Sequence, residues 1–264
     1  MQPLRGLRAM ASPPVVGLAV AERRVEGARA SVVCVHGGLD RGGSFARLAR
    51  RLERFDLVTY DRRGYQGSRA LGVGTHDEHV ADLLSLIRAE RENSPVLVFG
   101  HSVGGVVALG AAVAEPSLVD LVVAYESPLP WVLPREHSRP VLGEDPREEA
   151  EIFFKRMVSR SSWERLSDTE KESRRLDGPA LLADLRSVRG VAPFDLSSLS
   201  AAAAYVHGDG VLAPYYRELA ALLADRFSLR TIEMTGAGHG AHLANPDQLA
   251  ELLSRLWDDT CASA

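Results

Sequence analysis

Short apolar runs rich in β-branched residues alternate along the chain with longer stretches in which apolar positions recur every three or four residues. Seven of these short runs predict strands: Val15–Val20, Ala30–Val35, Leu57–Tyr60, Val96–Phe99, Leu121–Tyr125, Ala202–Val206 and Leu229–Met234. Strands that alternate with helical patterns are typical of a mainly parallel sheet covered by helices. The pattern therefore predicts an α/β fold.

One of the helices has a clear beginning. Residues Thr75–Glu78 match a capping box, in which a threonine and a glutamate three residues later bond to each other's backbone N–H groups. The apolar positions that follow share one helical face: Val80, Leu83, Leu84 and Ile87. The H-x-x-H spacing of His76 and His79 could suit a metal, but on a solvated first turn we expect both to be surface residues.

The alternation stops between Pro128 and Pro193, where the sequence is charged, helical and without a strand-like run. We predict a helical cap over residues 128–193, inserted into a core made of residues 1–127 and 194–264. Its apolar side chains would either form the core of the cap or face a cavity beneath it, and both roles are compatible. Four of them are predicted to line a substrate pocket: Trp131, Phe153, Phe154 and Met157.

Composition narrows the classes of function. With Lys+Arg 31 against Asp+Glu 35, the net charge is −4 and there is no basic stripe, so nucleic-acid binding has no electrostatic support. No apolar run approaches the roughly 20 residues that span a bilayer, and residues 1–14 lack the apolar core of a signal peptide. Cys34 and Cys261 make no disulfide framework, which favours a cytoplasmic protein. The oligomeric state stays open.

The candidate chemistry is concentrated after the fourth predicted strand. Val96–Phe99 runs into Gly100-His101-Ser102-Val103-Gly104, and a helix of small residues follows. A G-x-S-x-G sequence between a strand and a helix is typical of a nucleophile elbow, a sharp turn that exposes the serine oxygen. Ser102 is therefore the predicted nucleophile.

A serine hydroxyl needs a base to remove its proton. His239 follows the last predicted strand on a glycine-rich loop, at the edge where active sites form in open α/β sheets. His242 is a rival, but His239 is nearer the strand and is preferred. The charge that develops on the carbonyl oxygen needs N–H donors, for which we predict the amides of Val103 and Gly38.

Four motifs in this order resemble the α/β-hydrolase fold superfamily: His36-Gly37-Gly38, Asp61–Ser68, Gly100–Gly104 and Gly238-His239. The resemblance covers nearly the whole chain apart from the cap. It implies a three-layer fold with a mostly parallel eight-stranded sheet, a lid inserted after strand six and a Ser–acid–His triad. The second motif is similar to a structural turn of the family, so no chemistry is assigned to it.

The acid of the triad departs from the family pattern. The usual acid follows the seventh strand, but Val211 stands at the expected position. Asp209 lies nearby on a shortened loop. Glu126, at the end of the sixth predicted strand, resembles the placement of the acid in some haloalkane dehalogenases. Glu126 is preferred and Asp209 is the alternative.

The nucleophile indicates the reaction. Dehalogenases and epoxide hydrolases of this fold use an aspartate, whereas a serine implies an acyl-enzyme. We predict a serine hydrolase that cleaves a small, fairly apolar carboxylic ester, thioester or lactone, with no metal or organic cofactor. Its partner would be a small-molecule acyl substrate. The alternatives are cofactor-free C–C-bond hydrolysis or haloperoxidase-like activity on the same triad, and a ligand-binding protein with little turnover.

Overall fold

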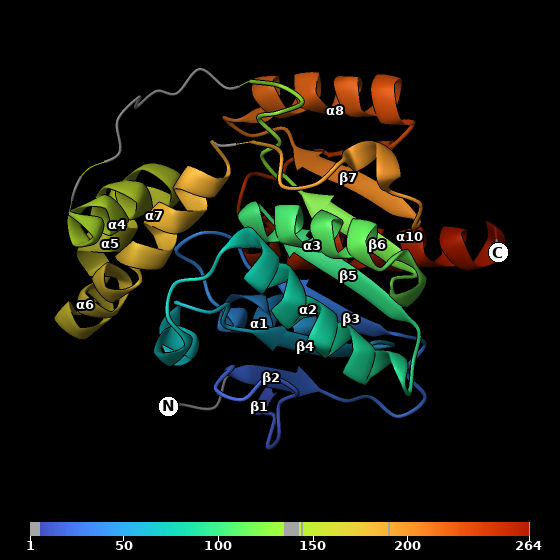
Figure 1. The fold of residues 1–264 in the computed structure, drawn as a ribbon, viewed down its shortest axis with the longest axis horizontal. Helices are drawn as coiled ribbons and strands as arrows, with labels where there is room; N and C mark the ends of the chain where they lie inside the picture. The colour runs from blue at the N-terminus through green and yellow to red at the C-terminus, as the bar shows by residue number, and fades with distance from the viewer. Residues whose placement is uncertain (1–5, 135–142, 144, 190, 264) are drawn as a thin grey trace.

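A computed structural model of the chain describes residues 6–134, 143, 145–189 and 191–263. One eight-stranded sheet forms the centre of the molecule (Figure 1). Its strands are β1 (Arg8–Ala9), β2 (Val20–Arg23), β3 (Ser31–Val35), β4 (Asp56–Tyr60), β5 (Val96–His101), β6 (Leu121–Tyr125), β7 (Ala203–Gly208) and β8 (Arg230–Met234). The predicted mostly parallel, eight-stranded α/β fold is confirmed.

The strand order is β1-β2-β4-β3-β5-β6-β7-β8. β1 pairs antiparallel with β2, β2 pairs antiparallel with β4, and the remaining pairs are parallel. Six of the seven predicted runs coincide with strands to within two residues. The first prediction is wrong: the strand begins at Val20, where Val15–Val20 was expected to end. Val16 is 89% exposed, so its apolar character reflects no burial.

Helices cover both faces of the sheet. The α-helices are α1 (Ala46–Ala49), α2 (His76–Arg91), α3 (Val103–Ala114), α4 (Pro146–Phe154), α5 (Arg160–Arg165), α6 (Asp168–Leu176), α7 (Gly178–Ser187), α8 (Ala213–Phe227), α9 (Ala241–Ala244) and α10 (Pro246–Ser263). Shorter 3₁₀ turns are η1 (Gly42–Phe45), η2 (Gln66–Leu71), η3 (Pro116–Leu118) and η5 (Leu196–Ser198), and η4 (Lys155–Ser159) is π-helical.

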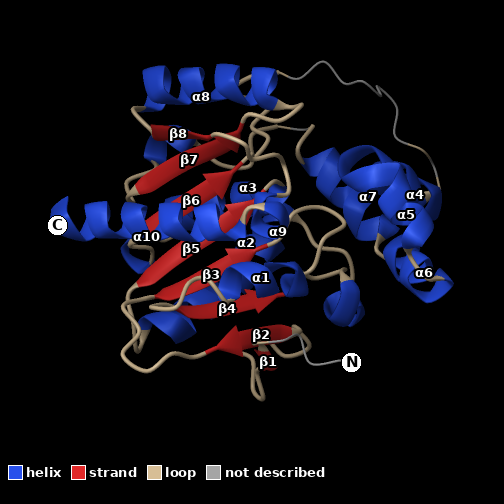
Figure 2. Cartoon of the chain, turned by 180° about the vertical axis from the view of Figure 1, so that it is seen from behind, coloured by secondary structure: helices blue, strands red, loops and turns tan. Residues whose placement is uncertain are grey.

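Alternation along β3 shows how the sheet separates two cores. Val33 and Val35 belong to a hydrophobic cluster that includes residues of α2, α3 and α8, whereas Val32 and Cys34 belong to a cluster on the opposite face that includes residues of α1 and α10. Successive strand side chains point to opposite faces, so one strand supplies both cores. Figures 1 and 2 view these two faces in turn.

The capping box at α2 forms as predicted. The Glu78 amide donates to the Thr75 hydroxyl, and the Thr75 amide donates to the Glu78 carboxylate. The surface location expected for His79 is wrong, because its side chain is 5% exposed and lies 3.3 Å from the Arg62 guanidinium. His76 is half-buried against Phe194. The two rings therefore have separate structural partners.

Helices α4 to α7, here called the helical segment (residues 146–187), follow β6 and precede β7 in the chain. They lie beyond the carboxyl ends of the parallel strands, past the arrowheads in Figure 2. Leu129 and Val132, which precede the segment, pack in the core of the sheet. Among the described residues, no helix combines the length and apolar character needed to cross a membrane.

Candidate active site

Ser102 occupies a sharp turn between β5 and α3. Its φ of 54° and ψ of −127° are unusual for a residue with a side chain, and its amide donates to the Tyr125 carbonyl at 2.8 Å. The turn depends on glycines where chains cross. A Cβ on Gly104 would lie 2.3 Å from the Val35 carbonyl oxygen, and one on Gly100 would lie 2.4 Å from the Gly105 Cα. The geometry is that of a nucleophile elbow.

The structure brings His239 against Glu126. Its Nδ1 lies 2.6 Å from Glu126 Oε2, while the Gly208 amide donates to the other carboxylate oxygen, Oε1, at 3.0 Å. Glu126 is 1% exposed, so both of its oxygens are satisfied inside the protein. Since a carboxylate only accepts, Nδ1 carries the proton and Nε2 is left as an acceptor.

Asp209 has a different partner. Its carboxylate accepts the Gly236 amide at 2.9 Å and so stabilises the turn after β8. This turn precedes His239 in the chain, and Asp209 supports it through the backbone. Of the two carboxylates, Glu126 is the one that bonds to the imidazole.

Two buried side chains hold the loop that carries His239. The Tyr125 hydroxyl donates to the Gly238 carbonyl, and His101 Nε2 lies within hydrogen-bond reach of the His239 carbonyl, each at 2.8 Å. A carbonyl only accepts, so His101 Nε2 carries its proton. His242, the rival base, is 2% exposed and packs between His101 and Phe45.

The loop after β3 lies directly beside the elbow. A Cβ on Gly37 would come within 2.9 Å of the Ser102 Cβ, and Gly38 lines the same cavity as Ser102. Val103 begins α3, and the first N–H groups of a helix have no partner within the helix. The Val103 amide and the Gly38 loop are therefore adjacent to Ser102.

A cavity of about 440 Å³ opens above Ser102 and His239. Its lining comes from the elbow, the helical segment and the start of α8. Phe153 and Met157 line it, as expected. Trp131 and Phe154 are not among its lining residues: Trp131 packs edge-on against Phe194, and Phe154 packs against Trp163 inside the helical segment. The predicted aromatic lining is therefore smaller than expected.

The sequence reasoning missed Asp184, on α7. This carboxylate lines the cavity and pairs with Arg62, which follows β4. Arg62 Nη2 lies 2.5 Å from Asp184 Oδ2, and Arg62 Nη1 lies 3.1 Å from Asp184 Oδ1. The Tyr65 hydroxyl also donates to Oδ2 at 2.5 Å. Arg62 further donates to the His36 carbonyl, so the pair joins α7 to the Gly37–Gly38 loop. A single aspartate in an amphipathic helix carries no sequence signal of such a partner.

Electrostatics around this pair follow from burial. Burial alone would raise the pKa of the Asp184 carboxyl, but the Arg62 guanidinium outweighs it and holds that pKa below its usual range. Burial, reinforced by the charge of Arg62, lowers the pKa of both His36 and His79 to about 3. These two imidazoles are therefore neutral at pH 7. The charged groups that connect α7 to the Gly37–Gly38 loop are Arg62 and Asp184.

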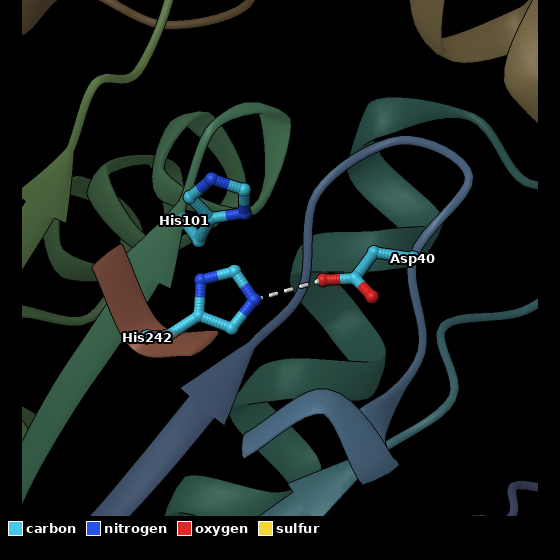
Figure 3. A group of neighbouring side chains, drawn as sticks. All are labelled: Asp40, His101 and His242. Carbon is cyan, nitrogen blue, oxygen red and sulfur yellow. Dashed lines mark ion pairs between the residues drawn. The ribbon is translucent and has the colours of Figure 1, made fainter. Parts of the chain in front are cut away.

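A second group of titratable side chains lies next to His239, whose ring contacts that of His101. Asp40, His101 and His242 each offer one ligand atom, and these atoms all lie within 4.8 Å of one another (Figure 3). Burial, with the neighbouring His242 and His239 rings, lowers the pKa of His101 well below its usual value, so this ring is neutral. Among the described residues, this is the group whose donor atoms suit a metal ion.

The fold and the elbow agree with a comparison against protein families. The profile of the Alpha/beta hydrolase family matches residues 32–252. This range includes the elbow, the loops that carry His36 and His239, and the helical segment. The chain belongs to the alpha/beta hydrolase family. It is accordingly a hydrolase, as the sequence motifs predict.

Curated relatives of this alpha/beta hydrolase match it over part of their length. An uncharacterized hydrolase, YraK, of Bacillus subtilis is 32% identical over 110 residues, covering 39% of each chain. Lipase LipV of Mycobacterium tuberculosis is 34% identical over 97 residues, covering 37% of each. The matched region therefore spans about two fifths of these relatives.

Solved structures extend the likeness of the fold to almost the whole chain. A lipase-esterase related protein from Clostridium acetobutylicum has a TM-score of 0.67 at 15% identity, covering 91% of this chain and all of the other. A thioesterase domain from the curacin biosynthetic pathway has a TM-score of 0.62 at 17% identity, covering 93% and 98%. At these identities the likeness concerns the fold.

Proposed function

We propose that this alpha/beta hydrolase is a serine hydrolase that cleaves a small, fairly apolar carboxylic ester, thioester or lactone through an acyl-enzyme. The observation that carries the proposal is the 2.6 Å contact between His239 Nδ1 and the buried Glu126 carboxylate, beside Ser102 in the same cavity. The contact leaves Nε2 of the imidazole free to take a proton. The partial resemblance to LipV agrees with ester chemistry.

In this mechanism Ser102 Oγ attacks the substrate carbonyl while His239 Nε2 accepts the hydroxyl proton. The imidazolium that forms faces the ionised Glu126, which stabilises the new charge and holds the ring in place. His239 then returns the proton to the leaving group, and the acyl group stays on Ser102. A water molecule, deprotonated by the same histidine, releases the carboxylic acid.

The oxyanion of the tetrahedral intermediate would be bound by the amides of Val103 and Gly38. Both residues line the cavity with Ser102, and the Val103 amide also lies at the positive end of α3. Donors aimed in advance at the developing charge commonly contribute about 3–4 kcal/mol each to transition-state stabilisation. The backbone supplies them without any further side chain.

The size and lining of the cavity support a small acyl substrate. A volume of about 440 Å³ lies in the lower half of the usual range for ligand pockets. The helical segment provides apolar walls through Phe153, Met157, Leu181 and Leu185.

The proposed location of the protein is the cytoplasm. Its two free cysteines, Cys34 buried and Cys261 exposed, agree with this proposal.

The test combines active-site labelling with turnover. Purified protein is treated with a fluorophosphonate probe and assayed on a panel of p-nitrophenyl esters of graded acyl length. We expect covalent labelling at Ser102, burst hydrolysis, and a loss of kcat of about 10³-fold or more in Ser102→Ala and in His239→Ala. The two losses should not add in the double variant, because the two residues act as one unit.

Ser94→Ala, a substitution at the end of the loop after α2, is the matched control and should leave labelling and turnover unchanged. Retained ester hydrolysis in well-folded Ser102→Ala protein would contradict the proposal. Labelling of Ser102 without turnover of any ester would instead favour the C–C-bond or low-turnover alternatives on the same triad.

A further inference from the structure

We propose that Asp40, His101 and His242 form a binding site for a divalent transition-metal ion of the zinc class, separate from the triad. The three residues come from different parts of the fold: the loop after β3, the end of β5 and α9. Figure 3 shows the two rings side by side, with the carboxylate reaching toward them from the opposite loop. No step of the proposed ester hydrolysis takes place on these three side chains, although His101 also holds the backbone of the His239 loop.

The imidazole nitrogens of this cluster are buried and lack hydrogen-bond partners on the side that faces its centre. His242 is 2% exposed, and neither of its ring nitrogens has a hydrogen bond. His101 is 7% exposed, and its Nδ1 is likewise unsatisfied. A buried polar atom left without a partner costs about 1–3 kcal/mol. Two of these atoms, His242 Nδ1 and His101 Nδ1, have no polar partner at all, whereas His242 Nε2 has only an ion-pair contact with Asp40; a bound cation would satisfy the atoms that face it.

The His101 ring is held in the tautomer that a metal ligand needs. Its Nε2 carries the proton, which is donated to the His239 carbonyl, so Nδ1 presents a lone pair. Histidines that bind metals commonly donate their other ring N–H to a backbone carbonyl, which fixes the tautomer needed for coordination. His101 is thus prepared as a ligand before any ion arrives.

The Asp40 carboxylate lies at a distance that suits a shared ion. His242 Nε2 lies 3.3 Å from Asp40 Oδ2, an ion-pair contact. Two ligands of a tetrahedral zinc ion, each about 2.0–2.2 Å from the metal, are roughly 3.3–3.5 Å apart. The Ser44 hydroxyl donates to Asp40 Oδ2 at 3.0 Å and orients it.

The third ligand must move a short way. All ligand atoms lie within 4.8 Å of one another, so His101 would approach the other two by up to about 1.5 Å on binding. The Asp40 side chain is 19% exposed and provides a route for the ion and for a water as fourth ligand. Imidazole nitrogens with one carboxylate favour zinc, cobalt or nickel over magnesium or calcium.

Direct metal binding tests the site. Untagged Cys261→Ser protein, which lacks the exposed thiol, is stripped with a chelator and titrated with Co²⁺, whose visible absorption reports coordination by the protein. We expect one equivalent to bind. Asp40→Ala and His242→Ala should each weaken binding by about 100-fold or more, since each removes a ligand.

His239→Ala separates this site from the triad and should still bind one equivalent. Loss of binding in His239→Ala would place the ion on the triad and overturn the proposal, as would the absence of stoichiometric binding in the Cys261→Ser protein. His76→Ala, a histidine outside the cluster, controls for surface binding.

A crystal of the Cys261→Ser protein grown with Zn²⁺ needs no ligand variant, should a buried substitution prevent folding. Anomalous scattering should give a peak among Asp40, His101 and His242. A peak at His239 and Glu126, or none within the cluster, would mean that Asp40 and His242 form an ion pair only.

Discussion

Two buried carboxylates, one bonded to His239 and one lining the cavity, have different kinds of partner. Glu126, 1% exposed, comes from the sheet and meets an imidazole and a backbone amide. Asp184, 3% exposed, comes from α7 and meets a guanidinium and a phenol. An imidazole can take up and release a proton during a reaction, whereas arginine stays charged throughout.

This difference in partners implies different roles for the two carboxylates: Glu126 in the proposed reaction and Asp184 in holding α7 against the sheet. A carboxylate beside a titratable ring can stabilise a charge that appears only during a reaction. A carboxylate beside a permanent cation is neutralised in every state, so its main effect is to hold two elements together. We therefore expect substitutions at Glu126 to change turnover, and substitutions at Asp184 to change stability and the seating of α7.

The largest effect is expected for Glu126→Gln. Glutamine keeps the shape but loses the charge and favours the wrong tautomer of His239, a change that costs about 10⁴ in kcat in a serine-protease triad. Steady-state kinetics on the preferred ester measures the loss, and circular dichroism checks the fold. Asp209→Asn is the matched control and should cost less than about tenfold. A larger loss in Asp209→Asn than in Glu126→Gln would reverse the assignment of the acid.

Asp184→Asn should lower the free energy of unfolding by about 3–5 kcal/mol, because it leaves the buried Arg62 without its counter-charge. Chemical denaturation measures this directly. Replacing both partners, as in Arg62→Met with Asp184→Leu, should recover much of the loss. Glu151→Gln, which removes the charge of a partly exposed carboxylate that pairs with Lys155 and Arg175 within the helical segment, should change the free energy of unfolding by less than about 1 kcal/mol. Equal losses in Asp184→Asn and Glu151→Gln would show that burial does not matter here.

The pH dependence sharpens the same contrast. Because the folded pKa of Asp184 is below its unfolded value of about 4, its ionised form stabilises the protein above pH ~4. This contribution falls as the pH drops through the folded pKa. The difference in unfolding free energy between wild type and Asp184→Asn should therefore shrink between about pH 5 and pH 2. A difference that is independent of pH over this range would mean that the carboxylate is not the source of the effect.

The smallest effect concerns the cavity wall that the helical segment supplies. Each methylene buried there should raise kcat/KM by up to about fourfold, from about 0.8 kcal/mol, until the cavity is full. Phe153→Leu should change this dependence on acyl length, because Phe153 lines the cavity. The adjacent Phe154→Leu should lower stability and leave the dependence intact, because Phe154 packs on Trp163. Identical chain-length profiles in both variants would mean that this wall does not contact the acyl chain.

Local features of the sequence predicted much of the fold. The capping box of α2 and the turn at Ser102 each involve residues that are close together in the chain. Their hydrogen bonds and steric limits can therefore be predicted from the local sequence. The preference for Glu126 as the acid rests on its place at the end of the sixth predicted strand, which resembles that of the acid in some haloalkane dehalogenases. The bond of Glu126 to His239 joins residues 113 positions apart and required the structure.

The sequence by itself determined the α/β architecture, the elbow and the two candidate carboxylates, since all three depend on local periodicity or on motifs of a few residues. Only the tertiary structure decided that Asp184 meets Arg62, that His79 is buried, that Trp131 and Phe154 lie away from the cavity, and that Asp40 lies beside two histidines. Each of these facts depends on which side chains from distant segments meet when the helical segment and the loops pack onto the sheet. An apolar residue favours burial and a charged residue favours an ion pair, but the tertiary packing determines which residue each one contacts.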